Sequence, residues 1–274
     1  MYGDKANNVE WQFNGKQQSH QNDITGLSFG EDYDENDQLQ TRLFSVGLDR
    51  RCFEYNVADA RLFTELPVKH HFNIENEAHP TTCIWYPKGD IKEDLLLTVN
   101  DDYKMKLWNP KTQNSRRTCL GPTYGGEIKS LSLLQIPNTN GIAEPDNYLI
   151  YSTGKKVVGL IKLPLDGNPH KTMGLVAHPG DVTDICASAD GKYIFTCGGD
   201  DLAVNMWSVD VAPINEEIEL YGGDTTEPFV NLIEGGREGQ TYQDMNDFFV
   251  YAMIRSMKED TTKTRKLEGT VPVD

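Results

Sequence analysis

The chain has 274 residues, of which 38% are hydrophobic, and this suits one large or two small domains with a buried core. It carries 42 acidic against 26 basic residues, a formal net charge of −16. That charge argues against binding nucleic acid, whose phosphates repel it, and against docking on anionic membranes. We expect no membrane span, because no apolar run reaches the roughly 20 residues that one needs. The scattered cysteines favour small buried hydrophobes in a reducing compartment.

The chain begins with a segment, residues 1–19, that contains one alternating apolar stretch at Val9–Phe13. We predict a single outer strand there. The first repeat follows from His20 to Asn56. Its first strand holds Ile24, Leu27 and Phe29, its second strand covers residues 43–46, and its predicted outer strand covers residues 61–66. Ser45, the turn residue Asp49 and the ring of Tyr55 recur at spacings of four and six.

The second repeat has the same spacing. Thr98 lies four residues before the acidic turn at Asp102, and Trp108 lies six residues after it. His79 precedes the first strand. A buried indole N–H and a buried imidazole both need hydrogen-bond partners, so we predict that these four side chains form one polar network.

The fourth repeat is as regular as the second, and the third is degenerate. His178, Asp201 and Trp207 repeat the network positions, with Cys197 at the Ser/Thr position. In the third repeat the strands persist at 128–133, 148–152 and 157–163. Lys156 takes the predicted turn position and Lys162 the tryptophan position, so we expect no network there.

These repeats resemble the WD-repeat family, in which a His, a Ser or Thr, the turn Asp and the Trp of each blade form a buried hydrogen-bond chain. The resemblance implies a mainly β fold, a WD-repeat β-propeller with four visible blades at residues 20–212, as part of a larger propeller. Closure by the four repeats alone, with residues 9–13 completing the last blade, is an open alternative. Three insertions, residues 31–40, 88–94 and 137–147, separate first and second strands, and insertions on one face often mark a binding face.

Residues 213–274 are predicted to form a linker, an amphipathic helix and an incomplete EF-hand-like loop. The helix covers 243–257, and its apolar stripe supplies the candidates for partner binding: Met245, Phe248, Phe249 and Met253. The loop, residues 264–271, has Gly269 at the sixth place but Lys266 at the third, where calcium needs an oxygen ligand. We therefore expect a loop that does not bind calcium.

The tail from Phe248 to Pro272 resembles a ciliary WD-repeat family, the subunit of the calmodulin- and spoke-associated complex at the base of radial spoke 3. The resemblance implies a scaffold in the cytoplasm and cytoskeleton, on the axoneme of motile cilia, that supports dynein regulation. The implied partners are the radial spoke 3 base, calmodulin-like EF-hand subunits and, indirectly, doublet microtubules.

Two other functions remain open, a generic cytosolic WD-repeat adaptor and a propeller hydrolase. We predict no catalytic residue, no metal site and no cofactor. His79, Thr98 and Asp102 have the composition of a catalytic triad, but the pattern recurs in other repeats, which favours a structural role. The neighbours His70 and His71 point to opposite faces of an extended segment and make a poor metal site.

Overall fold

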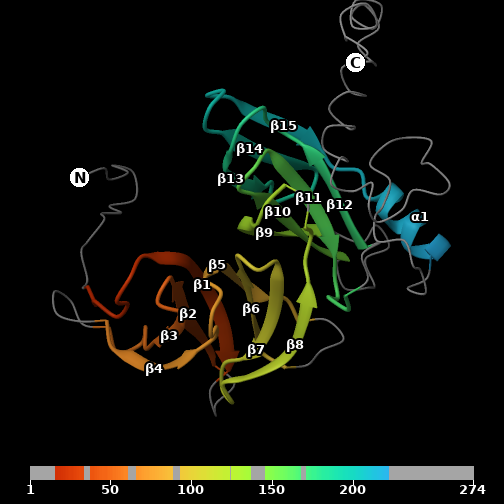
Figure 1. Ribbon diagram of the computed structural model, residues 1–274. Helices are drawn as coiled ribbons and strands as arrows, with labels where there is room; N and C mark the ends of the chain where they lie inside the picture. Colours follow the sequence, from red (N-terminus) through yellow and green to blue (C-terminus); the bar gives the residue numbers. More distant parts are fainter. Residues whose placement is uncertain are drawn as a thin grey trace, which may run out of the picture. The chain divides into compact units, whose positions relative to one another are not determined.

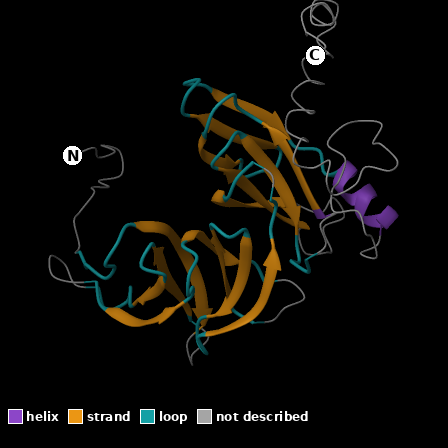
Figure 2. Ribbon diagram, in the orientation of Figure 1, coloured by secondary structure: helices purple, strands orange, loops and turns teal. Residues whose placement is uncertain are grey.

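A computed structural model describes residues 16–33, 38–60, 66–88, 93–123, 125–136, 146–167 and 171–221. These residues form fifteen strands and one helix, so the fold is mainly β (Figure 2). The strands group into four antiparallel sheets with sequential strand order, which is the arrangement of WD-repeat propeller blades. The predicted strand at 9–13, the helix at 243–257 and the EF-hand-like loop lie outside the described residues.

Blades 1 and 2 each contain four strands, labelled in Figure 1. Blade 1 consists of β1 (Ile24–Tyr33), β2 (Leu39–Gly47), β3 (Arg51–Tyr55) and β4 (Val68–Asn73). Blade 2 consists of β5 (Pro80–Tyr86), β6 (Leu95–Asn100), β7 (Lys104–Asn109) and β8 (Asn114–Leu120). All six residues of β6 are buried, as expected for an apolar strand that is covered on both faces.

Blade 3 also has four strands, and blade 4 has three among the described residues. Blade 3 consists of β9 (Ile128–Ile136), β10 (Asp146–Thr153), β11 (Val157–Lys162) and β12 (Thr172–Val176). Blade 4 consists of β13 (Val182–Ala187), β14 (Tyr193–Gly198) and β15 (Val204–Ser208). A helix, α1 (Ala212–Tyr221), follows it.

The four blades fall into two compact units, one with blade 1 and most of blade 2, the other with blades 3 and 4 and α1. The first unit has its core where blades 1 and 2 pack face to face. Phe44, Val46 and Phe72 of blade 1 meet Cys83 and Leu96 of blade 2 there. Sheets pack in this way when apolar side chains of the two inner faces interdigitate.

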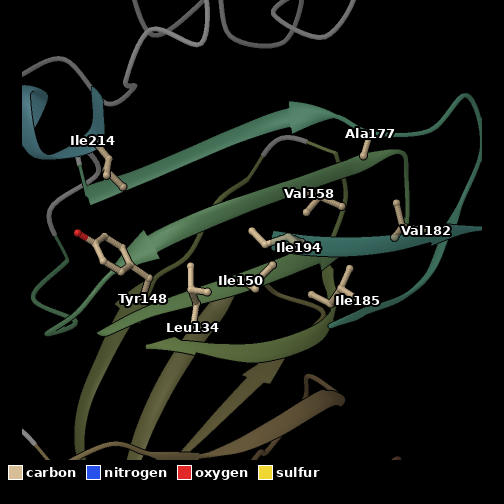
Figure 3. Close-up of a cluster of buried hydrophobic side chains, with 9 residues drawn as sticks. All are labelled: Leu134, Tyr148, Ile150, Val158, Ala177, Val182, Ile185, Ile194 and Ile214. Atoms are coloured by element: carbon tan, nitrogen blue, oxygen red, sulfur yellow. The ribbon is translucent and has the colours of Figure 1, made fainter. Parts of the chain in front are cut away.

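The second unit has its core between blades 3 and 4 (Figure 3). Leu134, Ile150 and Val158 from blade 3 meet Ile185 and Ile194 from blade 4. Burial of such aliphatic side chains stabilises the fold by about 1.5–3 kcal/mol each. The same packing fixes the relative position of these two blades within the unit.

Helix α1 is a correction to the prediction that a linker begins at residue 213. Asp210 accepts a hydrogen bond from the backbone N–H of Ala212 at 3.0 Å, so it caps the helix, and Pro213 stands in the first turn, where proline is tolerated. Ile214 is fully buried against the core of the second unit. These start signals, Asp210 and Pro213, are present in the sequence, but the sequence analysis did not use them to place a helix here.

The bounds of the strands in blade 1 also differ from the predicted ones. Residues 31–33 and 39–40 of the predicted first insertion are strand, because Glu31 pairs with Thr41 and Tyr33 with Leu39 in an extended hairpin. The outer strand of the blade is β4, and the predicted outer strand at residues 61–66 lies, apart from residue 66, outside the described residues. The third insertion likewise ends in strand, since residues 146–147 pair with β9.

The third repeat is degenerate, but the residues at its turn position and its tryptophan position each lie one residue before the predicted Lys156 and Lys162. Each blade has one non-glycine residue with positive φ in the turn after its second strand: Arg50, Tyr103, Lys156 and Leu202. In the other three blades the turn Asp directly precedes this residue, so Lys155 takes its place in blade 3. By the same register, Leu149 pairs with Ile161 as Leu43 pairs with Tyr55, so Ile161 takes the tryptophan position.

In blade 3 an aromatic ring occupies a position that belongs to the hydrogen-bond network in the other blades. Tyr151, fully buried, takes the Ser/Thr position and lies over Gly159 on the paired strand. A Cβ atom at Gly159 would lie 2.5 Å from the Tyr151 ring and 2.1 Å from the Met173 carbonyl oxygen. Glycine is therefore required there because the ring and the backbone approach too closely for any side chain.

The cysteines and the helix bear on two further predictions. No disulfide joins the five cysteines; Cys52, Cys83 and Cys119 are buried, whereas Cys186 is exposed, so the buried interpretation is wrong for that one. Burial raises the pKa of the Cys83 thiol to about 12. The helix in the described part of the chain is too short and polar to cross a membrane.

Candidate functional site

The network of blade 1 links the segment before β1 to strands β2 and β3. The two ring nitrogens of His20 lie 2.9 Å from Asp49 Oδ1 and 2.7 Å from Ser45 Oγ. Ser45 Oγ lies 2.8 Å from the hydroxyl oxygen of Tyr55, which also bonds to Ser19. His20, Ser45 and Tyr55 are buried. Because their polar atoms are paired, the network fixes this segment and the turn to the sheet.

His20 is a network member that the sequence analysis did not name. It stands 29 residues before its aspartate, whereas His178 stands 23 residues before Asp201. The extended β1–β2 hairpin accounts for the longer interval. The signal in the sequence is the histidine that opens the first repeat, and a fixed spacing rule misses it.

In blade 2 the structure brings together Thr98 and Trp108. The indole N–H of Trp108 donates to Thr98 Oγ1 at 3.1 Å. His79 Nε2 lies 3.3 Å from a guanidinium nitrogen of Arg50. Asp102 forms an ion pair with Lys104, and its side chain is 60% exposed. The turn of blade 2 is therefore far more exposed to water than the turn of blade 1, where the Asp49 side chain is 5% exposed.

Blade 4 has a complete network, with a correction at the Ser/Thr position. His178 lies 2.8 Å from Asp201 Oδ2 and 2.7 Å from Thr196 Oγ1, and the indole N–H of Trp207 donates to the same Thr196 oxygen at 3.0 Å. Cys197 was predicted for this position and does not occupy it. The turn of blade 4 is one residue longer, so the four-residue spacing points to the wrong neighbour.

Hydrogen bonding to histidine lowers the pKa of both network aspartates, Asp49 and Asp201. The His178 side chain, and then the backbone N–H of Ala203, lower the pKa of Asp201 below its ordinary value of 3.8. Burial opposes ionisation of Asp49, but hydrogen bonds from His20 and two backbone amides outweigh it and lower that pKa as well. Both carboxylates are therefore held in the ionised form.

We expect the Asp201 network to weaken in acid. A carboxyl whose pKa is lower in the folded state contributes stability that is full above pH 3.8 and is lost as the pH falls through the folded pKa. The melting temperature should therefore fall between about pH 5 and about pH 3. Asp201→Asn should start from a lower melting temperature and fall less over this range. An equal slope in both proteins would contradict the assignment.

A buried ion pair in blade 1 is a feature that the sequence analysis missed. Arg42 on β2 and Glu54 on β3 are 4% and 1% exposed. Two guanidinium nitrogens of Arg42 donate to the two carboxylate oxygens of Glu54 at 2.9 and 2.7 Å. This two-point contact suits the planar guanidinium. The available signal is a pair of opposite charges, each next to apolar residues, on two consecutive strands.

Neighbouring groups complete the surroundings of this pair. Lys69 and His70 on β4 lie 3.2 Å from the Glu54 carboxylate oxygens. The Arg42 guanidinium also lies over the rings of Phe44 and Trp85. Burial by itself would raise the pKa of Glu54, but the hydrogen bonds and charges of Arg42 and Lys69 outweigh it and lower that pKa. The pair is therefore ionised inside the interface between blades 1 and 2.

The arrangement of these groups favours a structural role over chemistry. In blades 1 and 4 the histidine side chain bonds both the hydroxyl group and the carboxylate, and the hydroxyl group also bonds a phenol or an indole. These hydrogen bonds hold the turn to the strands. His70 pairs with Glu54, and His71 stacks on Phe53. In the described residues, no group of three or more His, Cys, Asp or Glu side chains is arranged to hold a metal ion. Met245, Phe248, Phe249 and Met253 lie outside the described residues.

Comparison with known proteins decides the type of repeat. The profile of the family "WD domain, G-beta repeat" matches residues 167–208, which include the complete network of blade 4. Residues 167–208 of the chain form a WD repeat. The predicted WD-repeat fold is thereby confirmed.

Relatives extend the similarity to nearly the whole chain. Cilia- and flagella-associated protein 251 of Tetrahymena thermophila is 45% identical over 96% of this chain, and the protein of the same name from Mus musculus is 39% identical over 94%. The chain spans 28% and 19% of the lengths of these two relatives. Nuclear distribution protein PAC1 of Arthroderma otae is 23% identical over half of this chain.

Proposed function

We propose that this WD-repeat chain is a non-catalytic scaffold of motile cilia. It would act at the axoneme, where it docks radial spoke 3 and its regulators on doublet microtubules and so supports dynein regulation and ciliary beating. The observation that carries the proposal is the similarity to cilia- and flagella-associated protein 251 from two distant organisms over at least 94% of this chain.

The physical properties of the blades suit a scaffold. Paired buried polar groups, such as the network of His178, Thr196 and Asp201, hold turns and strands in one arrangement. In this network the histidine and hydroxyl groups that hydrolysis would need are hydrogen-bonded to each other, and they hold the turn to the strands. A rigid frame of this kind keeps the loops at the strand ends in fixed positions for partners.

The charge of the chain limits how it reaches a microtubule. A net charge of −16 repels the acidic surface of tubulin. We propose that attachment runs through basic adaptor proteins, whose charge complements this surface and speeds association. Weaker retention on axonemes in higher salt would agree with this, since salt screens such contacts.

The tail supplies the proposed site for calmodulin-like EF-hand partners. Met245, Phe248, Phe249 and Met253 recur at steps of three, one and four, which is the pattern of a helix that enters an apolar groove. Replacing Phe248 and Met253 by aspartate should abolish co-purification with an EF-hand subunit and leave the melting temperature unchanged. A matched variant, Asp247→Asn with Lys258→Gln, should keep the partner.

The function itself is tested in cells that build motile cilia. The tagged chain should enter cilia, stay with axonemes after detergent extraction and come off in salt together with spoke proteins. Its loss should impair beating and remove radial spoke 3, with the other spokes retained. A tagged chain that stays in the cell body, or normal spokes after its loss, would refute the proposal.

A generic cytosolic adaptor is the second candidate, and the similarity to nuclear distribution protein PAC1 over half of the chain favours it. This candidate predicts a diffuse cytosolic distribution and no loss of beating. The remaining alternative, a propeller hydrolase, predicts that Asp102→Ala abolishes turnover of a substrate while the fold stays intact.

A further inference from the structure

The connection that leads into blade 2 differs from those that lead into blades 1 and 4. The network histidines His20 and His178 each lie four residues before the first residue of β1 and of β13. In blade 2 the first strand begins at Pro80, so His79 lies only one residue before it. His79 therefore does not have the place along the chain that the network histidines have.

Backbone hydrogen bonds identify the residue of blade 2 that does have this place. In blade 4 the N–H groups of His178 and of the residue before it both donate to the carbonyl oxygen of Lys156, the positive-φ residue in the turn of blade 3. In blade 2 the N–H groups of Glu75 and of the residue before it donate to Arg50, the positive-φ residue in the turn of blade 1, at 3.4 and 3.0 Å. Glu75 is thus the counterpart of His178.

The residue that pairs with the start of the first strand changes together with the histidine. In blade 1 this residue is Gly47, where a Cβ atom would lie 2.7 Å from His20 Nδ1. In blade 4 it is Gly198, where a Cβ atom would lie 2.5 Å from His178 Nδ1. In blade 2 it is Asn100, which is fully buried. The Asn100 side chain therefore fills space that a network histidine would need.

Three side chains of blade 2 contact one another in this space. One carboxylate oxygen of Glu75 accepts a hydrogen bond from Asn100 Nδ2 at 3.0 Å, and the other lies 2.6 Å from Lys106 Nζ. The Glu75 and Lys106 side chains are 5% and 19% exposed. Lys106 Nζ also lies 3.4 Å from the carbonyl oxygen of Ile74, so the ammonium group holds the backbone beside Glu75 as well.

We propose that Glu75, Asn100 and Lys106 form a charged latch that replaces the histidine network in blade 2 and joins blade 2 to blade 1. The backbone of Glu75 is bonded to the turn of blade 1, and its carboxylate is bonded to β6 and β7 of blade 2. A buried carboxylate with an amide and an ammonium donor is satisfied and holds one arrangement. The latch does not need His79 or Asp102, whose side chain is 60% exposed.

Glu75→Gln tests the latch, because it keeps the shape of the side chain and removes its charge. It should lower the melting temperature by about 5–10 °C, since Lys106 keeps a mostly buried charge without its partner. His79→Gln and Asp102→Asn, at the predicted network positions, are the matched controls. Each should shift the melting temperature by less than about 2 °C. Tryptophan fluorescence, to which Trp108 of blade 2 contributes, follows the transition.

A double variant tests whether the two charged groups act together. Lys106→Met alone should also lower the melting temperature, because it leaves the Glu75 carboxylate buried without its cation. Glu75→Gln combined with Lys106→Met should lower it by less than the sum of the two single shifts, since neither charge is then left unpaired.

Placing a histidine in blade 2 separates the latch from a general loss of packing. Asn100→Gly alone should lower the melting temperature, because it removes a fully buried side chain. In the Glu75→His variant the same change should raise it, because glycine makes the room that Gly198 gives to His178. This reversal of sign is expected because Glu75 occupies the place of the histidine.

Three outcomes would overturn the proposal. A shift for His79→Gln as large as that for Glu75→Gln would mean that the histidine is the brace of blade 2. Fully additive shifts for the Glu75 and Lys106 variants would mean that these two side chains do not act as a unit. A lower melting temperature on adding Asn100→Gly to Glu75→His would mean that Glu75 does not stand in the place of a network histidine.

Discussion

Replacing Glu54 by glutamine is expected to lower the free energy of unfolding by about 3–5 kcal/mol, because it leaves the charge of Arg42 buried and unpaired. The two side chains are 1% and 4% exposed and contact each other at two points. Urea denaturation, followed by tryptophan fluorescence, measures the change. Trp85 lies beside the pair and reports on the same interface.

A second Arg–Glu pair in the same unit serves as the control. Arg116 Nε lies 2.8 Å from Glu93 Oε2, but these side chains are 45% and 46% exposed. Water and salt screen an exposed pair, so Glu93→Gln should have little effect on stability. Similar losses for Glu54→Gln and Glu93→Gln would contradict the argument that burial makes the first pair costly to break.

Removing both charges together should cost less than removing one. In Arg42→Met with Glu54→Leu, neither partner is left as an unpaired buried charge. The double variant should also lose acid sensitivity. The pKa of Glu54 is lowered in the folded protein, so its contribution is complete above pH 4.5 and is lost as the pH falls through the folded pKa.

Thr196→Val is expected to lower the free energy of unfolding by about 2–3 kcal/mol, because the buried His178 and the partly buried indole of Trp207 lose their shared partner. The hydroxyl group of Thr196 bonds both His178 Nε2 and the Trp207 indole N–H. Valine keeps the shape of threonine, so the loss measures the hydrogen bonds rather than a cavity. Thermal unfolding followed by circular dichroism gives the change.

Cys197→Ala is the matched control, since this neighbour was the residue predicted from the sequence. It is partly buried and stands on the opposite face of β14 from Thr196. Its replacement should cost clearly less than that of Thr196. If the cysteine variant proves the more damaging of the two, the assignment of the network in blade 4 is wrong.

The sequence by itself predicted the WD-repeat architecture, because strand periodicity and turn chemistry are local. The spacing of Ser45, Asp49 and Tyr55 recurs at Thr98, Asp102 and Trp108, and an antiparallel hairpin with a fixed turn converts that spacing into cross-strand neighbours. The same rule failed by one residue at Cys197, because a single extra turn residue in blade 4 changes which face of the strand a side chain occupies. At Lys156 the spacing is kept but starts one residue earlier, at Tyr151, and without network side chains nothing in the sequence marks where it starts.

Only the tertiary structure decided which side chains meet across strands and blades. Arg42 and Glu54 are twelve residues apart and become partners through the register of β2 and β3. The ring of Trp85 packs against Gly30 because blades 1 and 2 pack face to face. The exposure of Leu27 and Phe29 among the described residues is likewise seen only in the structure, since an alternating strand has the same sequence pattern whether or not a neighbour covers it.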